Sequence, residues 1–361
     1  MTAALALARD GATVTVLEAR DGPSDHGAGI QITPNGARAL GSLGVAPMLD
    51  AVGIAARAVV PVDALSGRRI ARFDLSAQSP PYRFVDRRDL VAGLTAACAA
   101  AGVDIRHGAR VTGAEASGIV HLGDGAIRAD LVVGADGIRS VLRPVCGNPG
   151  AAIFSGQVAW RAVIDAPGHP PEARIWMAPG RHVVTYPLTD GRLNLVAVQE
   201  RDAWAEEGWH HADDPETLRA AFADCCAELR DILAAVTTPR LWGLFRHPVA
   251  ARWHAGRVAL LGDAAHPTLP FLAQGANLAI EDAVVLARVV GQGRGLAAYE
   301  AARRPRVVRA IAAADANARN YHLSGLRRRV AHLGLSAIGR AAPGAFLSRL
   351  SWLYDHDVTA D

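Results

Sequence analysis

The chain has 361 residues and half of them are hydrophobic, so it can bury a large core in one big or two medium domains. Its formal net charge is +3 without a long basic run, which argues against nucleic acid as a main partner. All 38 basic side chains are arginine, which excludes enzyme classes that depend on a lysine, such as Schiff-base aldolases, pyridoxal-phosphate enzymes and P-loop NTPases.

Cysteine spacing and hydropathy bound the location of the protein. The four cysteines, Cys98, Cys146, Cys225 and Cys226, show no C-x-x-C pattern, which is typical of reduced thiols. No apolar run approaches the ~18 residues of a membrane span. The sequence therefore predicts a cytoplasmic protein without a transmembrane segment. It also lacks H-E-x-x-H and G-x-S-x-G, so no metal site and no simple esterase site is predicted.

The first elements predict part of a doubly wound α/β domain. Residues 2–10 predict a helix closed by Gly11, and the β-branched run 13–18 predicts a strand that ends in an acid. Two later apolar runs, 130–136 and 257–263, predict strands that are hydrophobic on both faces. Such strands belong to a buried parallel sheet that helices cover.

The middle of the chain predicts a sheet-rich insert. Residues 173–200 alternate in polarity and carry turn signals at Pro179-Gly180 and Asp190-Gly191, as in an antiparallel meander. Asp214 and Pro215 then predict the cap and first residue of a helix. From about residue 296 the chain is alanine- and arginine-rich and predicted helical.

Tryptophan and arginine clusters each allow two interpretations. The six tryptophans from Trp160 to Trp253 suit an aromatic pocket, although we expect at least half of them to be core. The arginine clusters at 303–306 and 327–329 would suit a partner or an anionic surface, but we expect solvated helix faces.

The segment 262–283, GDAAHPTLPFLAQGANLAIEDA, carries the strongest functional signal. Gly262-Asp263 places a carboxylate at the carboxyl end of a buried strand, where open α/β sheets bind ligands. A carboxylate there can accept hydrogen bonds from ribityl hydroxyls. Gln274-Gly275-Ala276-Asn277 opens a helix that stops at Gly291, and its free N–H groups would stabilise the negative charge of a reduced flavin.

Together with ADLVVGADGIRSVLR (129–143), this segment resembles the single-component flavoprotein aromatic hydroxylases of the para-hydroxybenzoate hydroxylase fold. It is most similar to the salicylate, 3-hydroxybenzoate and 6-hydroxynicotinate hydroxylase group. The resemblance covers nearly the whole chain and includes the segments 27–45, 84–90, 181–188 and 352–358. It implies an FAD-binding domain at 1–57, 85–152 and 250–295, a substrate domain at 58–84 and 153–249, and C-terminal helices at 296–361.

The resemblance also implies roles for individual residues. Glu18 would bind the adenosine ribose of FAD, and Arg87 would contact the ribityl–pyrophosphate region. Asp136 would lie near the pyrophosphate, where the reduced nicotinamide approaches the flavin. Gly262 and Asp263 would bind the ribityl chain, and Gln274, Gly275, Ala276 and Asn277 would lie beside the isoalloxazine. For Arg87 a salt bridge with Asp89 is the alternative, and for Arg139 and Arg143 a structural role is favoured.

The chain departs from the family at its start. The family begins with a strand and G-x-G-x-x-G, whose N–H groups cradle the FAD pyrophosphate. Here Gly27-Ala28-Gly29 follows the acidic strand, and Gly291, Gly293 and Gly295 end a helix. We therefore expect an N-terminally truncated sequence, with roughly 10 to 20 more residues encoded upstream, and a 361-residue protein that is poorly soluble or flavin-free.

The chemistry implied is hydroxylation of a small phenolic or heteroaromatic acid, with NAD(P)H reducing FAD and O2 forming a flavin C4a-hydroperoxide. A base that removes a phenolic proton activates the ring. Tyr186 is the first candidate, followed by His182 and His211. A substrate carboxylate suits an arginine, and Arg161, Arg174 and Arg181 all remain open.

The sequence also allows other functions, and it does not determine the oligomeric state. A flavin-dependent oxidase or a decarboxylating hydroxylase of the same fold, and a truncated non-catalytic remnant, are the alternatives. A homodimer is compatible with the sequence.

Overall fold

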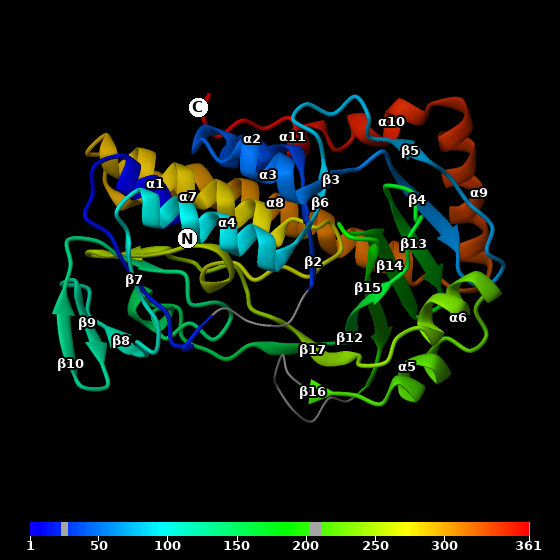
Figure 1. The fold of residues 1–361 in the computed structure, drawn as a ribbon, viewed down its shortest axis with the longest axis horizontal. Coiled ribbons are helices and arrows are strands. Elements are labelled where there is room, and N and C mark those ends of the chain that lie inside the picture. The colour runs from blue at the N-terminus through cyan, green and yellow to red at the C-terminus, as the bar shows by residue number, and fades with distance from the viewer. Residues whose placement is uncertain (23–27, 203–210, 361) are drawn as a thin grey trace.

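The structure, a computed structural model, describes residues 1–22, 28–202 and 211–360 (Figure 1). The side chains of His211, Pro343 and Phe346 also lie outside the description. The helices are α1 (Thr2–Arg9), α2 (Pro34–Ser42), α3 (Ala46–Val52), α4 (Arg87–Ala100), α5 (Pro215–Ala221), α6 (Ala227–Ala234), α7 (Gly275–Gly291), α8 (Leu296–Tyr321), α9 (Gly325–Ala341), α10 (Pro343–Ser348) and α11 (Ser351–Tyr354), with the 3₁₀ turns η1 (Pro144–Cys146) and η2 (Gly262–Ala264).

The parallel strands form two small sheets. β1 (Thr15–Leu17) pairs with β7 (Asp104–Arg106), and β11 (Val132–Gly134) pairs with β19 (Val258–Leu260). The other edge of β19 pairs with the antiparallel β18 (His254–Ala255). Among the described residues, β1 and β11 each have one edge without backbone pairing. The predicted strands are therefore present, while the sheet that they form is not continuous.

Helices cover these sheets as predicted. α1 packs between α4 and α7, and all three run side by side in Figure 1. Apolar residues of both small sheets, such as Val16 and Val132, belong to the same core as Leu5 of α1 and Leu286 of α7. This core fixes where the carboxyl ends of the strands point.

Two further antiparallel sheets flank this core. One contains β2 (Gly29–Ile32), β6 (Arg83–Asp86) and β3 (Gly53–Ala55), in that order. The other is a meander of β8 (Val111–Ala114), β9 (Ile119–Leu122) and β10 (Gly125–Arg128), which the sequence analysis missed. Its strands are short and mostly half-buried or exposed, so they lack a clear apolar pattern.

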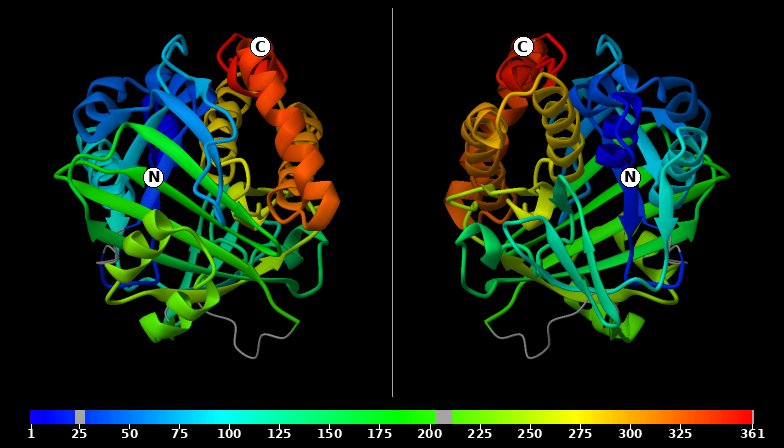
Figure 2. Two further views of the ribbon diagram at one scale, coloured as in Figure 1. Left: turned by 90° about the vertical axis from the view of Figure 1, so that its right-hand side faces the viewer. Right: turned by 90° about the vertical axis from the view of Figure 1, so that its left-hand side faces the viewer.

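The insert builds an eight-stranded sheet with the order β16-β17-β12-β15-β14-β13-β4-β5 (Figure 2). Its strands are β4 (Ala58–Asp63), β5 (Phe73–Asp74), β12 (Ile153–Asp165), β13 (Glu172–Ala178), β14 (Arg181–Pro187), β15 (Arg192–Glu200), β16 (His211–Ala212) and β17 (Arg240–Arg246). The predicted meander over 173–200 is confirmed. Its turns use positive φ angles at Gly180 (66°), Asp190 (62°) and Gly191 (71°), which glycine and aspartate tolerate.

One face of this large sheet is closed by α5 and α6. Trp160 and Trp176 are fully buried there, in a core shared with Leu218 and Phe222 of the α5 region. The predicted cap is confirmed, because the Asp214 carboxylate accepts a hydrogen bond from the Glu216 N–H at 2.9 Å. These two tryptophans are thus core residues and do not line a pocket.

The remaining tryptophans of the insert divide differently. Trp253 is buried between His266 and Tyr299, away from the large sheet. Trp242 lies on the opposite face of the large sheet from Trp160. Trp204 and Trp209 lie outside the described residues.

The predicted C-terminal helices are present, but the prediction of solvated arginines at 303–306 was wrong. Arg303 is 1% exposed and pairs with two carboxylates of α7, at 2.8 Å to Asp282 Oδ1 and 2.6 Å to Glu281 Oε2. Arg306 also binds Glu281, at 2.8 Å, and His266 lies 2.5 Å from Asp282 Oδ2. An acidic pair in a buried helix requires such partners, because unpaired buried charge is costly.

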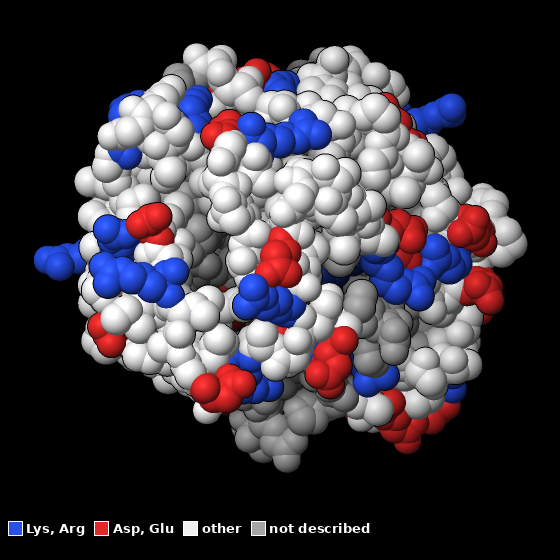
Figure 3. Space-filling model, turned by 60° about the vertical axis from the view of Figure 1, so that its left-hand side comes forward, with Lys and Arg blue, Asp and Glu red and all other residues white. Residues whose placement is uncertain are grey.

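The surface charges, the cysteines and the apolar helices were compared with the sequence predictions. Basic and acidic side chains lie interspersed over the face in Figure 3. All four cysteines are free. Within the described ranges, no helix is both long and apolar enough to cross a membrane.

Candidate functional site

Three of the predicted carboxylates follow parallel strands. Glu18 comes directly after β1, Asp136 follows β11, and Asp263 lies in η2 after β19; all three are exposed. Glu18 Oε1 accepts a hydrogen bond from Arg20 N–H at 2.9 Å. Asp136 Oδ2 accepts one from Val141 N–H at 2.8 Å, which holds the loop after β11.

Asp263 lies in a concave environment. Its side chain reaches solvent, yet burial by the surrounding protein raises its pKa, against the opposing charges of His266 and Arg87. A group that is both accessible and desolvated is typical of the wall of a cleft. A carboxylate of this kind can accept hydrogen bonds from a ligand.

Arg87 reaches the same place from a distant part of the sequence. It is the first residue of α4, whose cap is the Asp86 carboxylate accepting from Arg88 N–H at 2.9 Å. Arg87 is exposed, and its charge acts on both Asp263 and Arg161. The alternative salt bridge to Asp89 is not found among the described residues.

The start of α7 presents unpaired backbone donors. The first intrahelical bond runs from Leu278 N–H to the Gln274 carbonyl at 2.8 Å, and no side chain caps the helix. The N–H groups of Gly275 and Ala276, both half-buried, thus have no acceptor within the described chain. They carry the positive end of the helix dipole.

The side chains of Gln274 and Asn277 point inward instead. Gln274 Nε2 donates to Thr33 Oγ1 at 3.1 Å, and Asn277 Oδ1 accepts from Thr33 N–H at 3.0 Å. Asn35 connects Gln274 with Glu281, at 3.2 and 2.6 Å. These amides hold α2 against α7, so a ligand at this helix end meets backbone groups.

Gly262 allows β19 to approach α7 closely. Its φ is +56°, and a Cβ there would lie 3.0 Å from the Ala279 Cβ. Its N–H donates to Asp282 Oδ2 at 3.1 Å. A larger residue would push the strand away from the helix and displace Asp263.

One face of the large sheet carries most of the catalytic candidates. Antiparallel register places on this face, here called the site face, the residues Arg161, His182, Val184, Tyr186, Asn194 and Val196. Val196 belongs to an apolar cluster with Phe271, in the loop before α7, and Ala314 of α8. The site face therefore lies opposite the loop that leads from Asp263 to Gly275.

Tyr186 is fixed in place by its neighbours. Its ring stacks on Phe84, with centroids 5.0 Å apart and planes 27° apart. Gly29 is required beside it, because a Cβ there would lie 2.7 Å from the Tyr186 hydroxyl. Burial raises the pKa of Tyr186 above its ordinary value, although Arg161 and a hydrogen bond with Gln31 oppose the rise.

His182 is buried beside aromatic rings and a second histidine. Its Nδ1 lies 2.7 Å from His322 Nε2, and its ring centroid lies 5.5 Å from Phe271 and 5.2 Å from Tyr321. Burial lowers its pKa well below the ordinary histidine value. The backbone of His211 pairs with Leu241, and its side chain lies outside the description.

The structure separates the three candidate arginines. Arg174 pairs with Glu228 and Arg181 with Asp224. Arg161 has no carboxylate partner among the described residues; its guanidinium lies over Trp242, 4.6 Å from the ring centroid. Its buried Nε has no hydrogen-bond acceptor, and burial lowers its pKa.

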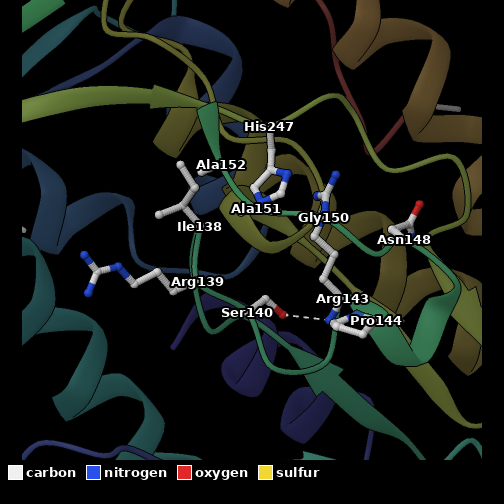
Figure 4. A pocket seen from close by; sticks show the side chains of 10 residues that line it. All are labelled: Ile138, Arg139, Ser140, Arg143, Pro144, Asn148, Gly150, Ala151, Ala152 and His247. Atoms are coloured by element: carbon white, nitrogen blue, oxygen red, sulfur yellow. Dashed lines mark hydrogen bonds between the residues drawn. The ribbon is translucent and has the colours of Figure 1, made fainter. Parts of the chain in front are cut away.

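Two cavities can be compared with the usual size of ligand pockets. One of about 200 Å³ lies beside the loop after Asp136 and is lined by Arg139, Arg143 and His247 (Figure 4). Arg143 is structural, as predicted, because it donates to the Ala264 carbonyl at 2.9 Å. This cavity is smaller than the ~300 Å³ of common ligand pockets. A second hollow, of about 360 Å³, is lined by Ile54 and residues 187–192, outside the site face.

Sequence reasoning missed the partners of His182. His322 is the residue directly after α8, and its Nδ1 lies 2.7 Å from Glu200 Oε1 at the end of β15. No local motif marks either residue, since only the docking of α8 on the sheet brings them together.

Comparisons with known proteins identify the family of the chain. Residues 1–314 match the family model described as an FAD binding domain. A 3-amino-4-hydroxybenzoate 2-monooxygenase of Streptomyces platensis is 35% identical, over 99% of this chain and 93% of the relative. A 3-hydroxybenzoate 6-hydroxylase of Klebsiella oxytoca is 30% identical, over 97% and 92%.

A solved structure shows the same fold. HpxO of Klebsiella pneumoniae, in complex with FAD and uric acid, superposes with a TM-score of 0.83 at 27% identity, covering 97% of this chain and 92% of HpxO. The matched domain, the relatives and the fold lead to one conclusion: the chain belongs to the FAD-dependent aromatic hydroxylase family and is an FAD-dependent aromatic monooxygenase.

Proposed function

We propose that this protein uses NAD(P)H and O2 to hydroxylate a small phenolic or heteroaromatic acid. The observation that carries the proposal is the site face, where an uncompensated arginine and a buried histidine lie opposite the loop between Asp263 and α7. Relatives that are named for hydroxybenzoate and aminohydroxybenzoate substrates support the same substrate class.

The residues that would hold FAD fit its chemistry. Asp263 would accept hydrogen bonds from ribityl hydroxyls, with Arg87 close by, and Glu18 would accept from the ribose. The backbone N–H groups of Gly275 and Ala276 would stabilise negative charge on the flavin ring. When bound, FAD supplies the electron transfer from NAD(P)H and the activation of O2. Asp136 is proposed at the nicotinamide approach.

Arg161 is the proposed partner of the substrate carboxylate. It is the one of the three candidate arginines whose charge is left unpaired by the described residues. Partial burial of a cation without an anion is unfavourable, so an anionic ligand would be stabilised there by charge-assisted hydrogen bonds. Asn194, whose Nδ2 also has no hydrogen-bond partner, lies on the same face.

His182 is the base that the geometry favours. Burial lowers the pKa of His182, so its ring is neutral and has a lone pair, and a proton that it accepts has to pass on to its partner His322. Tyr186 would have to be a phenolate, which its raised pKa disfavours. We assign Tyr186 the role of a wall that positions the substrate ring.

Product analysis with labelled oxygen tests the proposal. Holoenzyme is incubated with 18O2, NADH or NADPH, and a panel of hydroxybenzoates and hydroxynicotinates. The expected product carries one heavy oxygen on a ring that already bears a hydroxyl group. Formation of hydrogen peroxide alone with every acid would favour an oxidase and reject the proposal.

Asp263→Ala tests the flavin assignment. The variant is expected to purify folded but with much less bound FAD than wild type, measured by flavin absorbance. Asp130→Ala, an exposed acid in a surface pair with Arg257, serves as the control and should keep its flavin. Normal flavin occupancy in Asp263→Ala would reject this role.

A further inference from the structure

Three side chains form a continuous hydrogen-bonded path from the interior to the surface. His182 Nδ1 lies 2.7 Å from His322 Nε2, and His322 Nδ1 lies 2.7 Å from Glu200 Oε1. Exposure rises along the path, from 2% for His182 and 8% for His322 to 54% for the Glu200 side chain. The path thus ends at a carboxylate in contact with solvent.

The hydrogen bonds fix the tautomers of both histidines. A carboxylate only accepts, so Glu200 requires a proton on His322 Nδ1. His322 Nε2 then carries a lone pair and accepts a hydrogen bond from the Nδ1–H group of His182. His182 Nε2 is consequently left with a lone pair that does not take part in the contact with His322.

The surroundings disfavour a proton that stays on His182. The rings beside His182 are those of the titratable residues His322 and Tyr321 and of the apolar Phe271. Burial lowers the pKa of His182 and of His322, and for His322 the Glu200 carboxylate opposes this shift. Of the two histidines, His322 is the one whose protonated form the Glu200 carboxylate stabilises directly.

Backbone hydrogen bonds connect the three segments that carry His182, His322 and Glu200. Gly180 N–H donates to the His322 carbonyl at 3.2 Å, and Glu200 N–H donates to the Gly180 carbonyl at 2.9 Å. These bonds connect the β13–β14 turn with β15 and with the end of α8. The imidazole and carboxylate side chains are not needed for the connection.

We propose that His322 and Glu200 are positioning residues that carry the phenolic proton of the substrate from His182 to solvent. This inference rests on the proposed function. The substrate O–H bond breaks, and its proton binds His182 Nε2. The Nδ1 proton of His182 passes to His322 Nε2, and the Nδ1 proton of His322 passes to Glu200 and then to water. No electrons are transferred; the reverse passage restores both tautomers when the product oxygen is reprotonated.

Substrate ionisation in the holoenzyme tests the path without turnover. The hydroxybenzoate that the panel selects is mixed rapidly with Glu200→Gln and His322→Gln, and phenolate absorbance and proton release to an indicator dye are followed across pH. Proton release should slow at least about tenfold, with the dissociation constant changed by less than about twofold. Glu200→Asp should restore part of the rate.

Asp224→Asn is the matched control, because Asp224 is an exposed acid that pairs with Arg181, the neighbour of His182. It should ionise the substrate as wild type does. Wild-type rates and pH midpoints in both Glu200→Gln and His322→Gln, with a wild-type enzyme that forms product, would overturn the path alone. A wild-type holoenzyme that hydroxylates no acid would instead overturn the proposed function.

Discussion

Arg303 is fully buried and Arg161 is half-buried with a buried Nε, and the two arginines have opposite kinds of surroundings. Arg303 of α8 lies within 2.8 Å of Asp282 and 2.6 Å of Glu281. Arg161 of β12 has Trp242 beneath its guanidinium and no carboxylate partner in the described part of the chain. The protein compensates buried charge where helices are held together and leaves it uncompensated on the site face.

This difference separates structural charge from charge that is available to a ligand. Removing one partner of a buried ion pair leaves the other unpaired, which is strongly destabilising. An arginine without an internal anion contributes no such ion pair to folding, and its charge can be compensated by solvent or by a bound anion. Substitutions at the two sites should therefore affect different measurements.

The largest effect on stability is expected for Arg303→Leu. The substitution leaves Asp282 without its Arg303 partner in the core and Glu281 with Arg306 only, so the free energy of unfolding should fall by about 3–5 kcal/mol. Urea unfolding of wild type and variant measures the change. Asp74→Ala is the control, because its carboxylate is 60% exposed and its pair with Arg72 is worth less than ~1 kcal/mol. A similar loss of folding stability in Arg303→Leu and Asp74→Ala would contradict the structural role of the buried ion pairs.

A smaller loss of folding stability is expected when the pH is lowered. Burial raises the pKa of Asp282, but His266 and Arg303 outweigh it and lower the pKa from 3.8 to about 2. A lowered pKa stabilises the fold above the ordinary value, and this contribution, of about 2 kcal/mol, is lost as the pH falls from about 4 towards 2. The stability difference between wild type and Asp282→Asn should therefore narrow over that range. If the stability difference between wild type and Asp282→Asn stayed the same from about pH 4 to about pH 2, the lowered pKa of Asp282 would be contradicted.

The smallest effect on stability is expected for Arg161→Leu. The variant loses the contact with Trp242 but also the cost of a buried cation, so its free energy of unfolding should stay within about 1 kcal/mol of wild type. Chemical unfolding of the flavin-loaded proteins measures this. A loss comparable to that of Arg303→Leu would mean that Arg161 has a structural anion after all.

Much of the architecture follows from local patterns in the sequence. Apolar runs predicted β1, β11 and β19, and turn residues such as Asp190-Gly191 predicted the β13–β15 meander. The family motifs also predicted the positions of Asp263 and Gly275, because strand ends and helix starts are local features.

The remaining features depend on contacts between distant segments. Helical periodicity did not distinguish Arg303, buried against α7, from a solvated arginine. Tryptophan content did not tell which sheet face Trp160 or Trp242 would occupy, since a shift of one residue exchanges the faces. The pairing of His182 with His322 exists only after α8 docks on the sheet.

Binding of a hydroxybenzoate to Arg161→Leu tests the central claim most directly. Affinity is measured by flavin absorbance titration for the acid and for the matching uncharged amide, with Arg174→Leu as control. For the acid, Arg161→Leu should bind about 10- to 150-fold more weakly than wild type, as expected for hydrogen bonds to a charged group, and the amide should bind both proteins alike. Equal affinity of wild type and Arg161→Leu for the acid, or an equal loss in Arg174→Leu, would contradict the account.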